Sequence, residues 1–586
     1  MSHDQRLHRA RDLARTELLA RRGDAVFWSG HLSSSALAVA TALGALAQAG
    51  GSDDAPRIQK GLAWLSTHRN RDGGWGDTPG SPSNLPTTLL ALAAFRLAHT
   101  ALPTRAEACA EALANHLPFA EALAKIYGKD RTFSVPIRMT CALAGSLRWE
   151  GIPDLPLELA LLPRWLFPLL RLHVVSYALP ALIGVGLGVH AHAPQGLRWR
   201  LRQWATTRVL NRLICLQPEH GGFLDAIPLT SFVALGLVAA GHREHVVTSR
   251  CVEFLRSAQR ADGSWPIDSD LSVWVTSAAV QALASGDLPV AVKASALESW
   301  LVARQQRQTH PYTGAAPGGW AWTWRAGGVP DADDTAGALV ALRHLRGTNA
   351  QADDPVRAGV QWLCTLQNPD GGWPTFCRGW GHLPFDRSAP DLTAHVLRAL
   401  AAWPDADPRI SRALKRGLKY LQKTQKTDGA WIPLWFGNQH ATRQENPVLG
   451  TARVLRALAL FDSCLASGVW HPSALAADIA PTLNRALTFL LSAQLPTGGW
   501  GGATNVVASV EETALVIAGL HPWRNRSDVH TALRRAGDWL TARVEDGTWT
   551  TPVPIGLYFA QLWYEEQLYP MVWTTEALTL LAGDTA

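Results

Sequence analysis

Three carboxylates, Asp331, Asp333 and Asp334, lie together near the middle of the chain. A stretch with three tryptophans, residues 320–324, precedes them, and an apolar run, residues 337–345, follows. One acidic residue at a helix start is a common cap, because its side chain accepts hydrogen bonds from free backbone N–H groups. Capping does not account for three. Acids beside indole rings suit a reaction that delivers a proton and then stabilises a carbocation with aromatic faces.

The same kind of helix start recurs along the second half of the chain. A threonine opens an apolar helical pattern five times, at intervals of 59, 58, 58 and 62 residues. The threonines are Thr276, Thr335, Thr393, Thr451 and Thr513. Such a fixed period is an internal repeat, and it predicts helical units that stack on one another.

Comparison of equivalent positions in the repeat distinguishes structural residues from candidate catalytic residues. The residue two places before each threonine is in turn Trp274, Asp333, Asp391, Leu449 and Glu511. This position varies as a cavity-lining position would, and not as a helix cap. His395 follows Asp391 by four residues, so both lie on one helix face. If neighbouring repeats stack in register, Asp333, Asp391 and His395 converge.

A second repeat, Gln-x3-Gly-x-aromatic, alternates with the first. Its clearest copies are Gln217–Phe223, Gln259–Trp265, Gln367–Trp373, Gln425–Trp431 and Gln494–Trp500. Each unit therefore holds an outer helix, a glycine-rich turn and an inner helix, which predicts an all-α protein. We expect most of these tryptophans to be structural, with the ring and the amide tying one turn to the next helix.

Composition and charge exclude several classes of protein. The 586 residues suggest two or three domains. A net charge of +6 with dispersed basic residues disfavours nucleic acid as a partner. The seven cysteines form no C-x-x-C pair, which indicates a reducing compartment without structural zinc. The charged N-terminus has no apolar signal-peptide core, so we expect a cytoplasmic protein.

One segment could contact a membrane. The uncharged run at residues 174–189 is 16 residues long, shorter than the roughly 20 needed to span a bilayer. Arginine and tryptophan then alternate over residues 197–204, with Arg208 and Arg212 beyond. This pattern suits an interface with anionic lipid headgroups. A solvated basic helix with two packed tryptophans fits it equally well.

Several motifs together resemble those of squalene-hopene cyclases and the wider class II terpene cyclases. They are the Asp-x-Asp-Asp-Thr-Ala stretch, the Gln-Gly-Trp repeats, and local matches at residues 73–76, 81–84, 391–395 and 554–558. The resemblance implies two α/α barrels arranged as a dumbbell, bound to one membrane leaflet, with an apolar cavity between them. It places a catalytic barrel at residues 251–586 with the N-terminal helix 4–19, and the second barrel at residues 20–250.

The resemblance also implies roles for single residues. Asp333 matches the general acid that protonates a terminal double bond, and His395 matches its hydrogen-bond partner. Asp331, Asp334 and Asp391 match the surrounding polar cluster. The matching cavity aromatics are Trp274, Trp322, Phe376, Trp435 and Tyr564, with Tyr177 from the other barrel.

The chain departs from the family pattern in two ways. Val553 and Leu557 stand where aromatic residues are usual, which weakens stabilisation of late cations. Ala38 and Leu449 stand where glutamate and tyrosine tend to hold water near the proton path. We therefore expect Asp333 to act as the acid as in the family, and its reprotonation to follow another route. These departures leave the identity of the substrate and of the product undecided.

The resulting hypothesis is a cofactor-free isomerase that cyclises squalene to a hopane-type or less cyclised product. One alternative is a class II cyclase of another polyprene. A second is a repeat protein that binds an isoprenoid lipid without converting it, which the cost of burying carboxylates disfavours. Zinc prenyltransferases need a cysteine ligand beside Asp391 and His395, and none accompanies them, so no metal is predicted. Expected partners are a polyprenoid and a membrane surface, with a homodimer possible.

Overall fold

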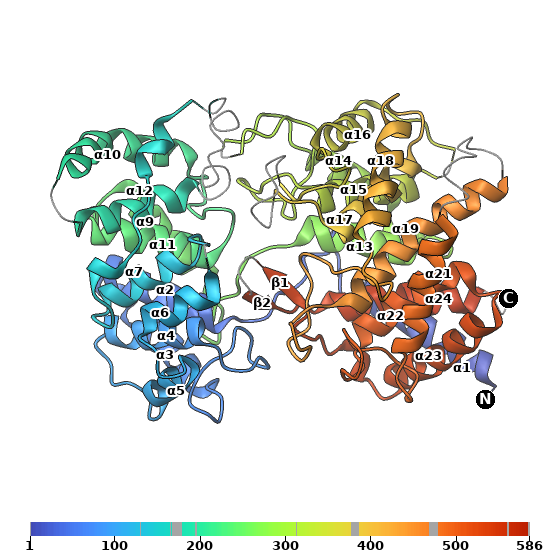
Figure 1. The fold of residues 1–586 in the computed structure, drawn as a ribbon, viewed down its shortest axis with the longest axis horizontal. Coiled ribbons are helices and arrows are strands. Elements are labelled where there is room, and N and C mark those ends of the chain that lie inside the picture. The colour runs from blue at the N-terminus through green and yellow to red at the C-terminus, as the bar shows by residue number, and fades with distance from the viewer. Residues whose placement is uncertain are drawn as a thin grey trace.

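The structure is a computed structural model that describes residues 2–128, 130–163, 166, 179–193, 196–311, 313–347, 349–376, 386–467, 479–558 and 562–583. It confirms the all-α prediction. The strands of the described chain are β1 (Gly556–Tyr558) and β2 (Leu562–Tyr564), which pair antiparallel. Two helical lobes lie side by side along the long axis, with β1 and β2 between them (Figure 1).

The first lobe is an α/α barrel, and its described residues form an inner ring of five helices. These are α2 (Ala36–Ala49), α4 (Leu85–Leu97), α7 (Ser134–Leu143), α9 (Leu179–Ala191) and α11 (Ile227–Ala239). Each contacts the next in this order, and α11 closes the ring on α2. The outer helices that pack on them are α3 (Ala55–Thr67), α5 (Ala106–Leu113), α6 (Phe119–Tyr127), α10 (Leu197–Leu216) and α12 (Val246–Ala258).

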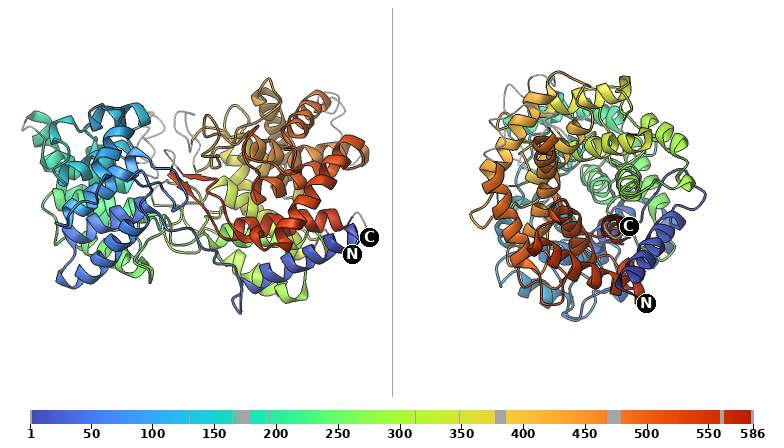
Figure 2. Two further views of the ribbon diagram at one scale, coloured as in Figure 1. Left: turned by 90° about the horizontal axis from the view of Figure 1, so that it is seen from below. Right: turned by 90° about the vertical axis from the view of Figure 1, so that its right-hand side faces the viewer.

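The second lobe repeats the plan with six inner helices, and Figure 2 shows their ring in its right-hand view. They are α13 (Ser272–Leu283), α15 (Ala332–Arg346), α17 (Pro390–Ala402), α19 (Pro447–Ser467), α22 (Val510–Leu520) and α24 (Leu568–Gly583). Neighbours contact in this order and α24 returns to α13. The outer helices are α14 (Ala294–Ala303), α16 (Asp354–Leu366), α18 (Ile410–Thr424), α21 (Ile479–Ala493), α23 (Ser527–Glu545) and α1 (His3–Ala20).

The N-terminal helix α1 thus joins the second lobe, where it lies against α23 and α24. Short 3-10 helices complete the described elements, at Ser52–Asp54, Trp149–Gly151, Leu157–Leu161, Val290–Val292, His521–Trp523 and Thr548–Thr550. The exact domain boundaries expected from the sequence stay a prediction.

Hydrogen bonds join the two sequence repeats in one structural unit, in which the glycine-rich turn is bonded to the threonine of the next inner helix. In the copy at Trp373 the indole N–H donates to the carbonyl oxygen of Leu363 at 2.8 Å, and the backbone N–H donates to Oγ1 of Thr393 at 3.0 Å. Nε2 of Gln367 donates to the carbonyls of Gly371 (2.8 Å) and Ala413 (2.9 Å), which lies on the next outer helix. The expected tie between turn and helix is confirmed. Gly371 has φ of +96°, a conformation that favours glycine.

The same turn recurs around both barrels. The indole N–H reaches the carbonyl ten residues earlier at Trp75, Trp265, Trp431 and Trp500. Each turn fixes where the following inner helix begins, because the threonine that receives the turn's N–H lies in its first turns. The scaffold therefore sets the register at which each inner helix faces the barrel axis.

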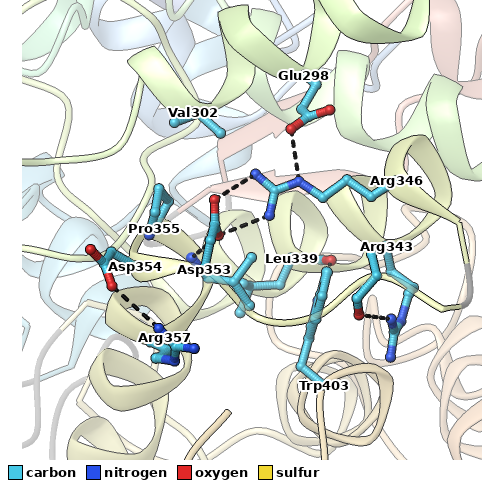
Figure 3. A network of polar contacts seen from close by, with 12 residues as sticks. Glu298, Val302, Leu339, Arg343, Arg346, Asp353, Asp354, Pro355, Arg357 and Trp403 are labelled. Atoms are coloured by element: carbon cyan, nitrogen blue, oxygen red, sulfur yellow. Dashed lines mark hydrogen bonds and ion pairs between the residues drawn. The ribbon is translucent and has the colours of Figure 1, made fainter. Parts of the chain in front are cut away.

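Ion pairs anchor the far end of the inner helix α15. Arg346 lies between two carboxylates, with Nε 2.8 Å from Oε1 of Glu298 and its terminal nitrogens 2.8 and 3.0 Å from Asp353 (Figure 3). Asp353 also caps α16, accepting the N–H of Val356 at 3.2 Å. These contacts hold α15 against α14 and α16. They therefore help to fix the position of the whole helix, including its first turn, where Asp333 lies.

Candidate active site

The acidic motif lies at the start of α15, and its three carboxylates have different environments. Asp331 is the helix cap, accepting the backbone N–H of Asp334 at 2.8 Å. The backbone N–H of Asp331 donates to the carbonyl of Trp320 at 3.0 Å, which joins the motif to the tryptophan stretch before it. Capping therefore accounts for Asp331 and leaves Asp333 and Asp334 to be explained.

Asp333 makes a short contact with His395 on the neighbouring helix α17. Its Oδ1 lies 2.6 Å from His395 Nδ1, and its Oδ2 lies 3.8 Å from Nη1 of Arg453 on α19. Burial alone would raise the pKa of Asp333, but the hydrogen bond and charge of His395, together with the charge of Arg453, hold it below its usual value. The convergence of Asp333 with His395 predicted from the repeat is confirmed.

Burial also lowers the pKa of His395, and Asp333 offsets part of that effect. The two shifts together favour an ionised Asp333 and a neutral His395. Both His395 and Arg453 stabilise the Asp333 carboxylate. Once fully protonated, such a pair makes Asp333 a strong acid, which the protonation of an alkene requires.

The pKa values of the other carboxylates in the cluster are raised, whereas that of Asp333 is lowered. Burial raises the pKa of Asp391 to about 6, although Arg453 opposes the shift, and the Asp391 carboxylate accepts the N–H of Leu434 at 3.2 Å. Burial raises the pKa of Asp331 to about 7 and, with the charge of Asp331, raises that of Asp334 well above its usual value. Environments that separate the pKa values of neighbouring acids in this way are typical of sites of proton transfer.

Aromatic rings form a continuous wall beside Asp333. The ring of Trp274 meets His395 edge-on, with centroids 6.4 Å apart, and its Nε1–H donates to the hydroxyl of Tyr569 at 3.1 Å. That hydroxyl lies 3.2 Å from the hydroxyl of Tyr564.

The wall continues through Trp322, Phe376 and Trp435. The ring centroids of Trp322 and Phe376 lie 6.1 Å apart, and those of Phe376 and Trp435 lie 6.3 Å apart. The indole N–H of Trp435 is bonded to Oγ1 of Thr375 at 2.9 Å, which holds this ring in place. Five of the six predicted aromatics therefore lie together, and Tyr177 lies outside the described residues.

A cavity of about 180 Å³, measured as the space open to water centres, lies against this wall. One water needs about 10–15 Å³ on that measure, so the cavity admits a chain of a dozen or more small groups. Its wall includes Asp331, Asp333 and Asp334 from the second lobe and residues such as Phe133 and Phe232 from the first. The site is thus an apolar space between the barrels with an acid at one end.

His395 and Asp391 do not line this cavity. They lie behind Asp333, where they border a smaller polar chamber inside the second barrel. Among the described residues, no group of three or more His, Cys, Asp or Glu side chains is placed to hold a metal. Within that same part of the chain, no helix has the length and apolar character to cross a bilayer.

Sequence reasoning missed Arg453 and Tyr569. Arg453 could have been found, because it lies two residues after Thr451, as His395 lies two residues after Thr393. The repeat places these two side chains on the same face of adjacent inner helices. Tyr569 carries no such signal, since α24 lies outside the threonine repeat.

Comparisons with known proteins agree with this geometry. The models of the squalene-hopene cyclase N-terminal and C-terminal domains match residues 12–187 and 271–469. The chain is 26% identical over 543 residues to enfumafungin synthase efuA of Hormonema carpetanum, covering 77% of this chain and only 38% of that protein. It is 25% identical over 472 residues to the squalene-hopene cyclase of Alicyclobacillus acidocaldarius subsp. acidocaldarius, covering 69% and 71%.

The fold is shared with a solved structure. The ent-copalyl diphosphate synthase from Streptomyces platensis superposes with a TM-score of 0.54 over 99% of this chain and 100% of that one, at 17% identity. At that identity the likeness concerns the fold alone.

Proposed function

Because the chain belongs to the squalene-hopene cyclase family of class II terpene cyclases, we propose that it is an isomerase that cyclises a polyprene by protonating a terminal double bond. The observation that carries this proposal is the Asp333–His395 contact of 2.6 Å at one end of an aromatic-lined cavity. A passive lipid pocket gains nothing from several buried carboxylates, since each costs free energy unless it is paired.

The reaction starts at Asp333. Its O–H bond breaks as the proton adds to the less substituted carbon of the terminal alkene, leaving a tertiary carbocation and a carboxylate stabilised by His395 and Arg453. Each following double bond attacks the cation in turn and closes a ring. Loss of a proton from the last cation balances the one that was added, so the product is an isomer of the substrate.

The aromatic wall stabilises the migrating charge. A desolvated cation–π contact contributes about 2 kcal/mol or more, and Trp322, Phe376 and Trp435 offer successive faces along the cavity. Because most of the remaining wall is apolar, water is kept from the cation until the rings have closed.

Squalene is the first substrate that we propose, with a hopene-type or partially cyclised product. The similarity to the squalene-hopene cyclase of Alicyclobacillus acidocaldarius supports this choice. A shorter or modified polyprene is the alternative, favoured by Val553 and Leu557 at positions where aromatic side chains would stabilise late cations.

The test is incubation of the purified protein with squalene, without added metal, followed by mass spectrometry of the extracted lipids. Asp333→Asn keeps the shape of the side chain and removes its acidic proton. Asp354→Asn on α16 is the matched control, because its side chain is 98% exposed. Isomeric products from wild type and control, lost in Asp333→Asn, support the proposal. If wild type converts neither squalene nor shorter polyprenes, the isoprenoid-binding alternative replaces it.

We further propose peripheral or monotopic contact with the cytoplasmic membrane through α10. Trp204 is 65% exposed, and the guanidinium of Arg208 lies 3.8 Å from the centroid of its ring. An exposed indole beside cationic groups suits the headgroup region of an anionic leaflet. Sedimentation with vesicles of anionic lipid tests this contact, and equal binding by wild type and Trp204→Ser would count against it. A homodimer remains a prediction that light scattering in detergent checks.

A further inference from the structure

The threonine repeat builds a second feature, a polar chamber on the axis of the second barrel. The residues two places after the threonines, Ala278, Gly337, His395, Arg453 and Leu515, all line it. So do the residues five places after them on four of the helices, Gln281, Arg398, Arg456 and Ala518. Positions three apart share a helix face, so the chamber has two layers of side chains. Val572, Trp573 and Glu576 of α24 complete its wall.

Positive charge dominates this wall. Arg398, Arg453 and Arg456 line it together with Glu576 and Asp391, and Asp333 faces Arg453 from outside the chamber. Glu576 is paired with both terminal nitrogens of Arg456. Burial opposes ionisation of Glu576, but the charge of Arg456 outweighs it and lowers its pKa. The wall itself carries three guanidinium groups and, with Asp391 ionised near neutral pH, two carboxylates, and the charge of Arg453 is shared with Asp333 across 3.8 Å.

The donors with few or no acceptors lie on Arg398, Arg453 and Ser277. Arg398 forms no ion pair with a described carboxylate, and its Nη2 donates to Oε1 of Gln281 at 3.3 Å. Burial, with the charge of Arg456, lowers its pKa to about 9. Nη1 of Arg453 has no hydrogen-bond partner in the described structure, and neither has the hydroxyl of Ser277, which is 1% exposed and lines the chamber. Buried donors without acceptors are costly, so a missing acceptor is expected here.

We propose that the chamber binds one small inorganic anion, of the size and charge of phosphate, between Arg398 and Arg453 with Ser277 as a third donor. Guanidinium groups are the preferred protein partners of such oxyanions. The chamber offers about 60 Å³ to water centres. At about 10–15 Å³ per water this is room for four to six atoms of that size, and phosphate has five heavy atoms.

The anion acts on the acid, a consequence that depends on the proposed cyclase function. His395 separates the chamber from Asp333, and Arg453 touches both. A bound anion stabilises the protonated form of His395 and cancels part of the field of Arg453 at Asp333. Both effects favour the doubly protonated pair that delivers the proton, so phosphate is expected to increase the cyclisation rate at constant ionic strength and at pH values above the pKa of Asp333.

Titration calorimetry with inorganic phosphate tests the site without reference to catalysis. Wild type is expected to give saturable heat for one site, and Arg398→Gln to weaken the affinity about 30-fold or more. Arg412→Gln is the matched control. Arg412 is exposed on the outer helix α18, so this substitution removes the same charge far from the chamber. No saturable heat from wild type, or equal affinity in Arg398→Gln, overturns the proposal.

A second variant guards against misfolding of Arg398→Gln. Ala278→Leu fills the chamber while leaving every charged group in place, and is expected to abolish phosphate binding with an unchanged circular dichroism spectrum. Phosphate binding that survives in folded Ala278→Leu places the anion elsewhere and overturns the proposal. Because the readout is binding, a protein that binds phosphate but cyclises no polyprene would refute the proposed function and leave the anion site intact.

Discussion

Arg453 adds to the effect of His395 in lowering the pKa of Asp333, and its removal should shift the pH dependence of the reaction. The Nη1–Oδ2 distance is 3.8 Å. At an effective dielectric constant of about 20, two unit charges at that distance interact by about 4 kcal/mol, which corresponds to about three pKa units. The guanidinium charge is spread over three nitrogens and the chamber holds polar groups, so we expect the pKa of Asp333 to rise by about one to two units in Arg453→Met.

The sign follows from the protonation state that the reaction needs. Arg453 stabilises the carboxylate, so its loss raises the pKa of Asp333. Activity requires protonated Asp333 and falls as pH rises through that pKa. The alkaline limb of kcat/KM against pH should therefore move to higher pH by about one to two units, because this profile reports groups of the free enzyme. At low pH the variant should be slower than wild type, since its acid is weaker.

The assay measures product formation from the converted polyprene at pH values from about 3 to 8, because the pKa of Asp333 in wild type lies below the usual value of an aspartate. Methionine keeps the bulk that packs against Phe436, whose ring centroid lies 4.5 Å from the Arg453 guanidinium carbon. Arg453→Lys keeps the charge and should retain the limb of wild type, and exposed Arg412→Met controls for net charge. A limb that stays in place or moves to lower pH in Arg453→Met would refute the reasoning, because Asp333 would then not be the group that titrates.

Three further predictions test the wall, the buried acids and the turns. Trp322→Leu should slow cyclisation about 30-fold, the equivalent of about 2 kcal/mol of lost cation–π stabilisation, while Trp324→Leu, at a residue 46% exposed, should change it little, as steady-state rates will show. Burial raises the pKa of Glu511 to about 8, so between about pH 5 and 8 the folded state keeps a proton that the unfolded chain has lost, and stability falls by up to about 1.4 kcal/mol per pH unit. The Tm of Glu511→Gln relative to wild type should thus rise from pH 5 to pH 8, and a constant difference would contradict the assignment. Gln367→Leu leaves the carbonyls of Gly371 and Ala413 without their donor and should destabilise by about 1–3 kcal/mol, seen as a lower midpoint in urea, whereas an unchanged midpoint would show that water replaces the amide.

The sequence by itself determined the scaffold and the position of the proposed acid. The Gln-Gly-Trp turns and the threonines are local signals. Each tryptophan of these turns bonds to a carbonyl ten residues earlier, and the turn glycine adopts a positive φ that its own residue type permits. Their period fixed the helical units, and comparison of equivalent positions indicated that Asp333 and His395 would meet. Motif resemblance named five of the aromatic residues that line the cavity.

Only the tertiary structure decided how charge is shared around the acid. The distance from Arg453 to Asp333 depends on how α15, α17 and α19 pack around one axis, and whether Arg398 forms an ion pair depends on how the other inner helices pack around it. Tyr569 completes the aromatic wall from α24, which carries no threonine repeat. A local pattern tells which face of a helix turns inward, because helical periodicity is a property of a few residues. Which side chains then touch, and which stay without a partner, depends on packing between segments hundreds of residues apart.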